Sequence, residues 1–292
     1  MKSPEKDSAK CSAVRFADQV AVLILTCNEA PNIARTLDAL RRFPEVVVLD
    51  SRSLDETVEI ANCYPNTRVI RRDFDQHATQ WNYGLTACGI ERPWILALDA
   101  DYALPDPLVT EISSLPLHTP VAGYRARFRY CVHGQRLSAA LYPPHVILFR
   151  RSKAHYVQEG HTQRVVIDGP VGELVGRVDH DDRKPLSRWL ESQRKYARLE
   201  AEYLLSKPRQ TLRGVDRLRL SGWAAPLIVP VYTLLAKRCI FDGVSGWLYV
   251  LQRTVAELMI SLEILDQRLR ERQGLADGNC ERISADPGRG VP

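Results

Sequence analysis

Four short apolar runs in the N-terminal third of the chain, each followed by polar residues, constrain its fold more than any other feature. They cover residues 20–25, 46–49, 69–70 and 94–98. Between the first two runs, apolar residues recur at helical spacing at Ile33, Leu37 and Leu40, and Pro31 stands near the expected helix start. Strand and helix therefore alternate, which predicts a parallel sheet with helices on both faces.

The connections after the second and third runs carry further helix signals. Ser53 and Glu56 stand three residues apart and form a capping box, so we expect the second helix to begin there. A third helix is expected to contain Gln80, Trp81 and Asn82, ahead of the fourth strand.

Beyond residue 101 the pattern changes to a period of two residues. Aromatic and aliphatic residues from Tyr124 to Val132 alternate with arginines, which is typical of a half-exposed strand. Residues 146–149 and 165–167 are expected to form further strands in a mixed or antiparallel extension of the sheet. The arginines form either a phosphate-binding face or a solvated strand face.

The C-terminal part is predicted to be helical from Ser187 onward. Its apolar segment over residues 222–236 is broken by two prolines and follows a basic stretch. Such a segment suits the headgroup region of a membrane, and a buried core hairpin is the alternative. The last helix, over residues 244–269, carries large apolar residues at helical spacing, and we expect them to pack on neighbouring helices.

Two aspartates follow the fourth apolar run directly. A buried strand ending in Asp99 turns Asp99 and Asp101 toward the same side, where their charges repel each other and resist desolvation. A divalent cation, Mg²⁺ or Mn²⁺, is the natural counter-charge for such a pair. The alternative is a polar turn in which the aspartates cap a helix opened by Pro105 and Asp106.

Polar residues also follow the other three predicted strands. Thr26, Asn28 and Glu29 follow the first, Asp50 follows the second, and Arg71 and Arg72 follow the third. Taken alone, the polar residues of each loop are of the kinds commonly found in turns. Because the carboxyl ends of parallel strands share one edge, where ligands bind in open α/β sheets, the four loops together predict a site.

These motifs resemble those of family 2 glycosyltransferases with the GT-A fold, especially bacterial enzymes of lipopolysaccharide core and envelope glycan synthesis. The resemblance covers roughly residues 20–190 and rests on four stretches: LTCNEAPNI, VVLDSRSLDET, HATQWNYGL and Asp99-Ala100-Asp101.

The resemblance implies a role for each matching residue. The first loops would hold the nucleotide of a nucleotide-sugar donor, and Asp99 and Asp101 would bind the cation that bridges the donor's diphosphate. His180 is a candidate third cation ligand or diphosphate contact, and a helix-opening turn rich in aspartate is its alternative. The implied donor-binding residues are Thr26, Asn28, Glu29, Asp50, Gln80, Asn82 and Asp99. Arg72 is a further donor-binding candidate, because a guanidinium can pair with the charge of the leaving diphosphate.

Inverting transfer also needs a base that takes the proton of the acceptor hydroxyl. The loop YVQEGHTQRV supplies Glu159, which we favour, and His161 as the second candidate. A solvated loop carboxylate is the alternative reading of Glu159.

Composition bears on partners and location. A formal net charge of +5 is too small an excess for nucleic-acid binding and suits an anionic substrate or membrane surface. The polar N-terminus lacks a secretory signal, and no window holds eighteen uninterrupted apolar residues. We therefore expect a peripheral or monotopic protein at the cytoplasmic face of the inner (plasma) membrane.

The sequence thus predicts four regions: a flexible tail (residues 1–18), a GT-A catalytic domain (19–186), a helical region with an interfacial membrane segment (187–273), and a disordered tail (274–292). The expected activity is metal-dependent, inverting transfer of a sugar from a nucleotide diphosphate, expected to be UDP, to a lipopolysaccharide-core, exopolysaccharide or lipid-linked acceptor. Two alternatives are a membrane-docked protein that binds nucleotide sugars without turnover and a sugar nucleotidyltransferase.

Overall fold

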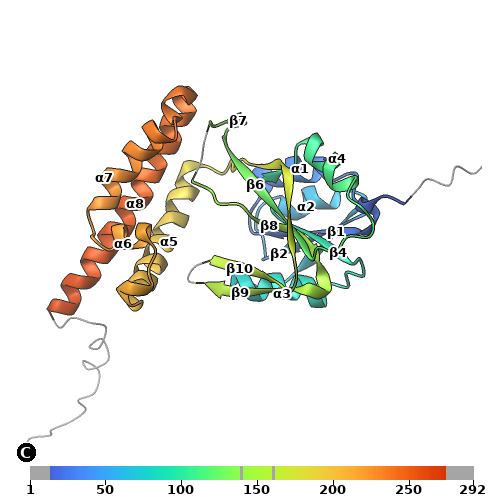
Figure 1. The fold of residues 1–292 in the computed structure, drawn as a ribbon, viewed down its shortest axis with the longest axis horizontal. Coiled ribbons are helices and arrows are strands. Elements are labelled where there is room, and N and C mark those ends of the chain that lie inside the picture. The colour runs from blue at the N-terminus through green and yellow to red at the C-terminus, as the bar shows by residue number, and fades with distance from the viewer. Residues whose placement is uncertain (1–13, 139–140, 160–161, 274–292) are drawn as a thin grey trace, which may run out of the picture. The chain divides into compact units, whose positions relative to one another are not determined.

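The computed structural model describes residues 14–138, 141–159 and 162–273, and the chain divides into two compact units. The first unit comprises residues 1–136 and 141–184, and the second comprises residues 137–140 and 185–292 (Figure 1). The tails predicted for residues 1–13 and 274–292 lie outside the described residues. Phe16 and Ala17, which the sequence assigned to the flexible tail, are instead buried in the core within a short 3-10 helix, η1 (Phe16–Gln19).

The alternation of strand and helix predicted for the N-terminal part is confirmed. The strands run parallel in the order β3-β2-β1-β4, and a helix follows each of the first three along the chain. These elements are β1 (Val20–Thr26), α1 (Ala30–Ala39), β2 (Glu45–Asp50), α2 (Thr57–Asn62), β3 (Thr67–Arg71), α3 (His77–Ala87) and β4 (Trp94–Asp99).

The sheet continues beyond β4 as the predicted mixed extension. β8 is antiparallel to β4 and to β6, β6 is parallel to β11, and β11 is antiparallel to β5. These elements are β5 (Tyr102–Ala103), α4 (Asp106–Ser113), β6 (Gly123–Val132), β7 (Gln135–Arg136), β8 (His145–Arg150), η2 (Arg151–Lys153) and β11 (Val171–His180). A separate hairpin is formed by β9 (Ala154–Glu159) and β10 (Thr162–Ile167).

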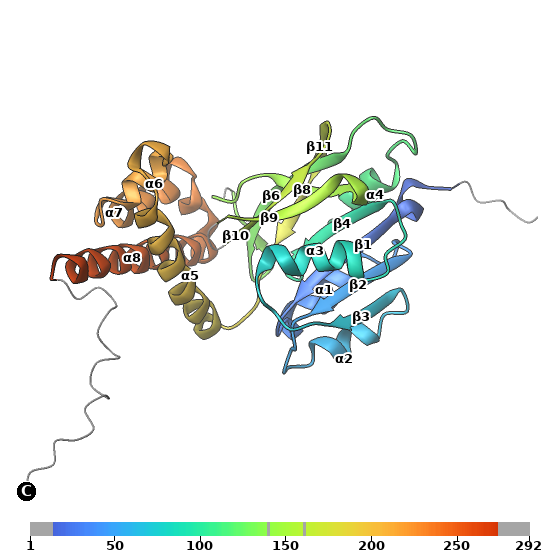
Figure 2. The same ribbon diagram turned by 90° about the horizontal axis from the view of Figure 1, so that it is seen from below.

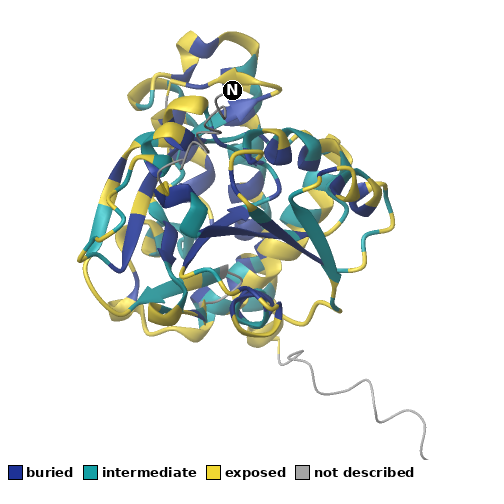
Figure 3. Cartoon of the chain, turned by 90° about the vertical axis from the view of Figure 1, so that its right-hand side faces the viewer, coloured by how far each residue is buried: buried dark blue, intermediate teal, exposed yellow. Residues whose placement is uncertain are grey.

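Strand β1 explains why the central strands are apolar at every position. Val20, Val22 and Ile24 join the core on the side of α1, α2 and α4, whereas Ala21 and Leu23 join the core formed with α3 and the hairpin. Successive side chains of a strand point to opposite faces, so a strand covered on both sides needs apolar residues throughout. Figures 1 and 2 show the sheet with α1, α2 and α4 on one face and α3 with the hairpin on the other. Figure 3 shows the buried central strands in dark blue.

In the first unit one local prediction is wrong and one long strand was not predicted. The second helix begins at Thr57 rather than at the Ser53–Glu56 box, because the Ser53 hydroxyl donates to Asp50 instead of capping a helix. Strand β11 was missed because only scattered positions along it are buried and its pairing with β6 shifts between Glu173 and Arg177.

The arginines of β6 are placed as a strand face. Arg125 and Arg127 are exposed, as the two-residue period predicted. Arg125 pairs with Glu173 and Arg129 pairs with Asp179, both on neighbouring β11. Those carboxylates supply the counter-charges of two of these arginines, which favours the strand-face reading over a phosphate-binding one.

The second unit is helical, as predicted. Ala197, Ala201 and Leu204 of α5 pack with Ile260 and Ile264 of α8 in its core. Its elements are α5 (Leu186–Ser206), η3 (Arg209–Thr211), α6 (Gly214–Arg219), α7 (Ala224–Val231), the π-helical turn η4 (Tyr232–Ala236), η5 (Cys239–Asp242) and α8 (Gly243–Arg272).

The packing face of α8 includes Tyr249, Ile260 and Ile264, but other large apolar residues expected to pack lie outside it. Trp247, Leu251 and Leu262 are 46%, 56% and 66% exposed. The buried face also includes the small residues Ala256 and Ser261, which allow neighbouring helices to approach closely.

The segment over residues 222–236 has features of both structures considered for it, the membrane-interface segment and the buried core hairpin. Ala225 and Val229 are buried against the rest of the unit, whereas Leu227 and Val231 are exposed. Across the described residues, no single helix has the length and apolar character needed to cross a membrane. Only the pair Ala224–Ala236 and Cys239–Arg272, bent by 73°, reaches those criteria together.

Candidate active site

The polar loops after the four parallel strands meet at one edge of the sheet, as predicted. In the strand register, Thr26 lies opposite Asp50, and Asp50 lies opposite Arg71. On the other side of β1, Leu25 lies opposite Asp99. The sheet thus gathers side chains that are far apart in sequence.

The first two loops are joined to each other by hydrogen bonds. The Thr26 hydroxyl donates to Asp50 Oδ1 at 2.9 Å, and the Leu54 N–H donates to Asn28 Oδ1 at 2.7 Å. Asn28 has φ of 56°, in the left-handed region that asparagine tolerates better than most residues. Asp50 is fully buried and also accepts hydrogen bonds from Ser53, so its carboxylate fixes the shape of the loops.

The third loop brings Arg72 and Gln80 together. Arg72 pairs with Asp75 at 2.8 Å and donates to Gln80 Oε1. Gln80 in turn donates to the Ser51 hydroxyl at 3.1 Å, so the second and third loops are connected through α3.

Asn82 is hydrogen-bonded to strand β9, and the predicted base Glu159 belongs to that strand. The Asn82 amide donates to the Tyr156 carbonyl and accepts from the Tyr156 N–H, both at 2.8 Å. Trp81 stacks on the Tyr156 ring with centroids 5.1 Å apart, so α3 holds β9 in place. Glu159 is the last residue of β9, and its side chain is not among those described; His161 lies outside the described residues. Both remain predictions.

Strand pairing places His180 beside Asp101. Tyr102 pairs with His180 in the β5–β11 ladder, and His180 Nε2 lies 3.1 Å from Asp101 Oδ2. β4 ends at Asp99, so Asp101 lies in the turn that follows, and the Thr36 hydroxyl donates to the Ala100 carbonyl in that turn at 2.6 Å. The pair is therefore supported by α1 as well as by the sheet.

Both alternative readings of these residues are wrong. Helix α4 begins after Pro105 without a side-chain cap, so Asp99 and Asp101 do not cap it. His180 ends a strand rather than opening a helix, since α5 starts at Leu186.

Burial and charge set the protonation of this cluster. Burial, with the nearby charge of Asp101, raises the pKa of Asp99 to about 6. Burial also acts to raise the pKa of Asp101, but the attraction of His180 outweighs it and holds the pKa below its usual range. The pKa of His180 is raised because Asp101 outweighs the effect of burial. Asp101 and His180 thus form an ion pair, and a positive charge bound beside Asp99 would favour the ionised form of its carboxyl group.

Two buried atoms of this pair have no hydrogen-bond partner among the described residues: Asp101 Oδ1 and His180 Nδ1. A buried carboxylate oxygen without a partner is costly unless a ligand satisfies it, and oxygen is the donor that Mg²⁺ and Mn²⁺ prefer. Within the described ranges, however, no three His, Cys, Asp or Glu side chains are arranged to hold a metal. The residues fit a cation that is completed by substrate phosphates and water, as Mg²⁺ usually is, rather than one enclosed by protein.

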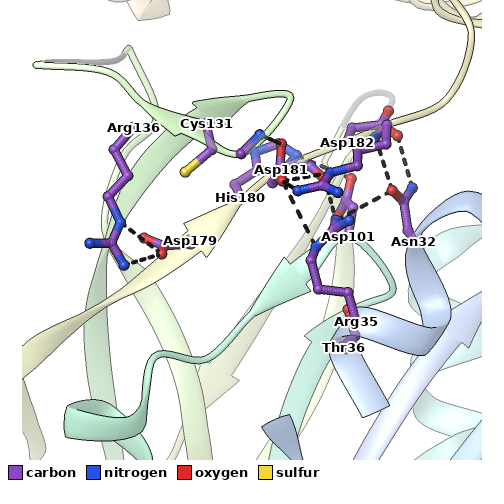
Figure 4. Close-up of polar contacts among 12 residues, drawn as sticks. Asn32, Arg35, Thr36, Asp101, Cys131, Arg136, Asp179, His180, Asp181 and Asp182 are labelled. Atoms are coloured by element: carbon purple, nitrogen blue, oxygen red, sulfur yellow. Dashed lines mark hydrogen bonds and ion pairs between the residues drawn. The ribbon is translucent and has the colours of Figure 1, made fainter. Parts of the chain in front are cut away.

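Lys184, Asn32 and Arg35 belong to this cluster and were not predicted. Lys184 Nζ lies 2.7 Å from Glu29 Oε1, and Asn32 Nδ2 donates to both Glu29 and Asp182 at 2.9 Å. Figure 4 shows Asn32 and Arg35 of α1 reaching toward the segment that follows β11. The only sequence signal was the polar stretch over residues 178–189, which gave no indication of its partners in α1.

Aromatic rings surround His180 on the side of the sheet extension. The rings of Tyr130, Tyr142 and Tyr102 lie 4.9, 5.0 and 5.3 Å from the His180 ring, centroid to centroid. The Tyr102 and Tyr142 hydroxyls are hydrogen-bonded to each other. These contacts fix the plane of the imidazole against Asp101.

Known proteins resemble this chain mainly over the elements that build the site. Residues 21–156 match the model of the family described as glycosyl transferase family 2. The lipopolysaccharide core biosynthesis glycosyltransferase LpsC of Rhizobium meliloti is 25% identical over 255 residues, which cover 76% of this chain and 92% of that protein. An uncharacterized glycosyltransferase of Rickettsia felis is 34% identical over 96 residues, 32% of this chain, and the chain spans 33% of that protein.

Among solved structures, S. aureus TarS 1-349 in complex with UDP-GlcNAc matches with a TM-score of 0.44 and 14% identity, covering 87% of this chain and 92% of that one. The mixed sheet with helices on both faces is the GT-A-type α/β architecture that the motifs implied. The family match includes β1 to β4 and their loops, so residues 21–156 are the part of the chain that resembles glycosyl transferase family 2.

Proposed function

We propose that this chain is an inverting, metal-dependent glycosyltransferase. It moves a sugar from a nucleotide diphosphate, UDP, to a lipopolysaccharide-core, exopolysaccharide or lipid-linked acceptor. The family match over residues 21–156 supports the reaction class, and the relative named for lipopolysaccharide core biosynthesis, aligned over 92% of its length, supports the acceptor class.

Asp101 and Asp99 are the residues that would hold a divalent cation. The unpartnered Asp101 Oδ1 is the observation that carries this proposal, because it is a buried carboxylate oxygen at the edge where the loops meet. When bound, the cation neutralises the negative charge that develops on the leaving diphosphate. His180 keeps the other Asp101 oxygen engaged and so orients the carboxylate.

The surrounding loops bind and orient the donor in this proposal. Asn28 and Asp50 keep the first two loops in one conformation, and Arg72 offers a guanidinium to the diphosphate. Lys184 adds a second positive charge near Asp99 and Asp101. Glu159 takes the proton of the acceptor hydroxyl as the new bond forms.

Release of UDP from UDP-sugars by the purified full chain, with and without Mn²⁺, tests the proposal. Asp101→Asn should lower release by about a hundredfold or more, the usual cost of losing one main charge-stabilising group. Asp168→Asn removes an exposed carboxylate paired with Lys153 and should leave release unchanged. Equal release by wild type and Asp101→Asn would refute the metal assignment.

Binding is measured separately from turnover. Mn²⁺ together with UDP should raise the melting temperature of wild type and not of Asp101→Asn, because a ligand of the native state stabilises it. Wild type that binds UDP-sugars but releases no UDP, with any acceptor supplied, would instead be a binding protein.

A further inference from the structure

An exposed apolar face runs along the second unit from α7 to the start of α8. Trp223, Leu227, Val231 and Leu235 recur every four residues, which places them on one side of the α7–η4 helix, and they are 57–67% exposed. Phe241 of η5 and Trp247 of α8, in the elements that follow along the chain, are 80% and 46% exposed. We call these six residues the apolar face.

The charges around the apolar face have one sign. Between residues 220 and 252 the charged side chains are Lys237, Arg238 and Asp242. Asp242 is buried, and its carboxylate accepts hydrogen bonds from the Ser138 N–H and hydroxyl. The charges that this segment offers to a partner are therefore positive.

We propose that the apolar face docks on the anionic headgroup surface of a lipid bilayer. Apolar and aromatic side chains enter the interfacial layer, and Lys237 and Arg238 contact lipid phosphates. Tryptophan is enriched at membrane–water interfaces, and two of the six residues are tryptophan. This surface deepens the proposed function by giving the enzyme its place at the cytoplasmic face of the inner membrane, as a peripheral or monotopic protein.

A second copy of the chain is a poorer occupant of this face. In a two-fold symmetric dimer the same patch lies on both sides of the interface. Lys237 and Arg238 of each copy would then approach only positive charges, and such like-charge contacts cost several kcal/mol. An anionic surface complements both the apolar area and the charge.

The change in charge along α8 marks where the docking surface ends. Leu262 is 66% exposed, almost the same as Leu227 at 64%. Glu263 and Asp266 follow Leu262 in α8, and Asp266 pairs with Arg270, so the residues around Leu262 lack the exclusively positive charge that suits anionic lipid. Leu262 is therefore a control position for Leu227, because both leucines are almost equally exposed in the same unit and only Leu227 belongs to the apolar face.

Sedimentation of the full chain with phosphatidylcholine vesicles, with or without phosphatidylglycerol, tests the proposal. Wild type should bind the anionic vesicles more tightly, and binding should weaken with salt. Leu227→Ser/Phe241→Ser should lower the partition coefficient at least about tenfold, because two exposed apolar anchors are lost. Leu262→Ser should partition like wild type. Lys237→Gln/Arg238→Gln should lose about fivefold per charge on anionic vesicles only.

Three outcomes would overturn the proposal. Wild type could stay in the supernatant with both vesicle types, or Leu227→Ser/Phe241→Ser could bind as well as wild type. Thirdly, wild type could form a dimer that this variant dissociates, without any lipid binding. Melting temperatures of the variants in the absence of lipid control for folding. The assay uses neither donor nor metal, so its failure is distinct from failure of the proposed enzyme activity.

Discussion

Lys184 Nζ lies 2.7 Å from Glu29 Oε1, which joins the segment after β11 to the start of α1. Burial raises the pKa of Glu29 to about 7, although Lys184 acts to lower it. Burial acts to lower the pKa of Lys184, but Glu29 and Asp182 outweigh it and raise that pKa. Each group therefore favours the charged form of the other at a position where burial opposes both charges.

Replacement of Lys184 should expose this dependence on pH. In Lys184→Met the pKa of Glu29 rises further above its unfolded value, because its positive neighbour is gone. A raised pKa gives stability that is complete below the unfolded value of 4.5 and is lost as pH rises through the folded value. The stability gap from wild type should therefore widen above pH 7 and reach about 1–3 kcal/mol, measured by urea unfolding with EDTA at about pH 6 and 8.5.

Two further variants separate this effect from general damage. Lys153→Met removes an exposed partner of Asp168, and the stability gap should stay below about 1 kcal/mol at both pH values. In Lys184→Met/Glu29→Gln the widening above pH 7 should vanish. A gap in Lys184→Met that does not change with pH would assign its cost to something other than Glu29.

Asn82 and Gln80 should differ in what they support, although the sequence predicted donor binding for both. Asn82→Ala leaves the Tyr156 N–H and carbonyl without partners, so it should destabilise the fold by about 1–3 kcal/mol. It should leave the Kd for UDP with Mn²⁺ unchanged. Gln80→Ala frees Arg72 from α3 and should weaken UDP binding by about tenfold. Calorimetric titration decides, and equal losses of UDP affinity would return Asn82 to the donor site.

The sequence could predict the sheet edge because its signals are local. Each of the strands β1 to β4 contains an apolar run, only two residues long in β3, and the polar residue that ends the run is adjacent in sequence, as with Leu98 and Asp99. Parallel pairing then brings those ends together without any further information from the sequence. For the same reason the sequence identified Asp50 and Asp101 as candidate site residues without information on the side chains that contact them.

The rest of the site depends on contacts that leave no local pattern. Lys184 and Glu29 are 155 positions apart, and neither has a spacing that indicates the other. His180 reaches Asp101 only because β11 pairs with β5, and β11 lacks the regular alternation that would have revealed it. In α8, several residues have a helical spacing, and that spacing did not identify the buried face, because Ile260 and Ala256 are buried while Leu262 is exposed.

A buried ion pair in the second unit gives the last prediction. Arg219 Nη2 lies 2.7 Å from Oε1 of Glu257, whose side chain is 1% exposed. Removing one partner of a buried pair leaves an uncompensated charge, so Arg219→Met should destabilise the unit by about 3–5 kcal/mol. Arg219→Met/Glu257→Met should recover only part of that loss, because Glu200, 3.1 Å from Arg219 Nη1, also loses its contact with Arg219. Arg270→Met breaks the exposed pair with Asp266 and should cost less than about 1 kcal/mol. Thermal unfolding of the full chain compares the stability of the three variants. If Arg219→Met is as stable as Arg270→Met, then Arg253, 3.4 Å from Glu257, is sufficient to compensate the charge of Glu257.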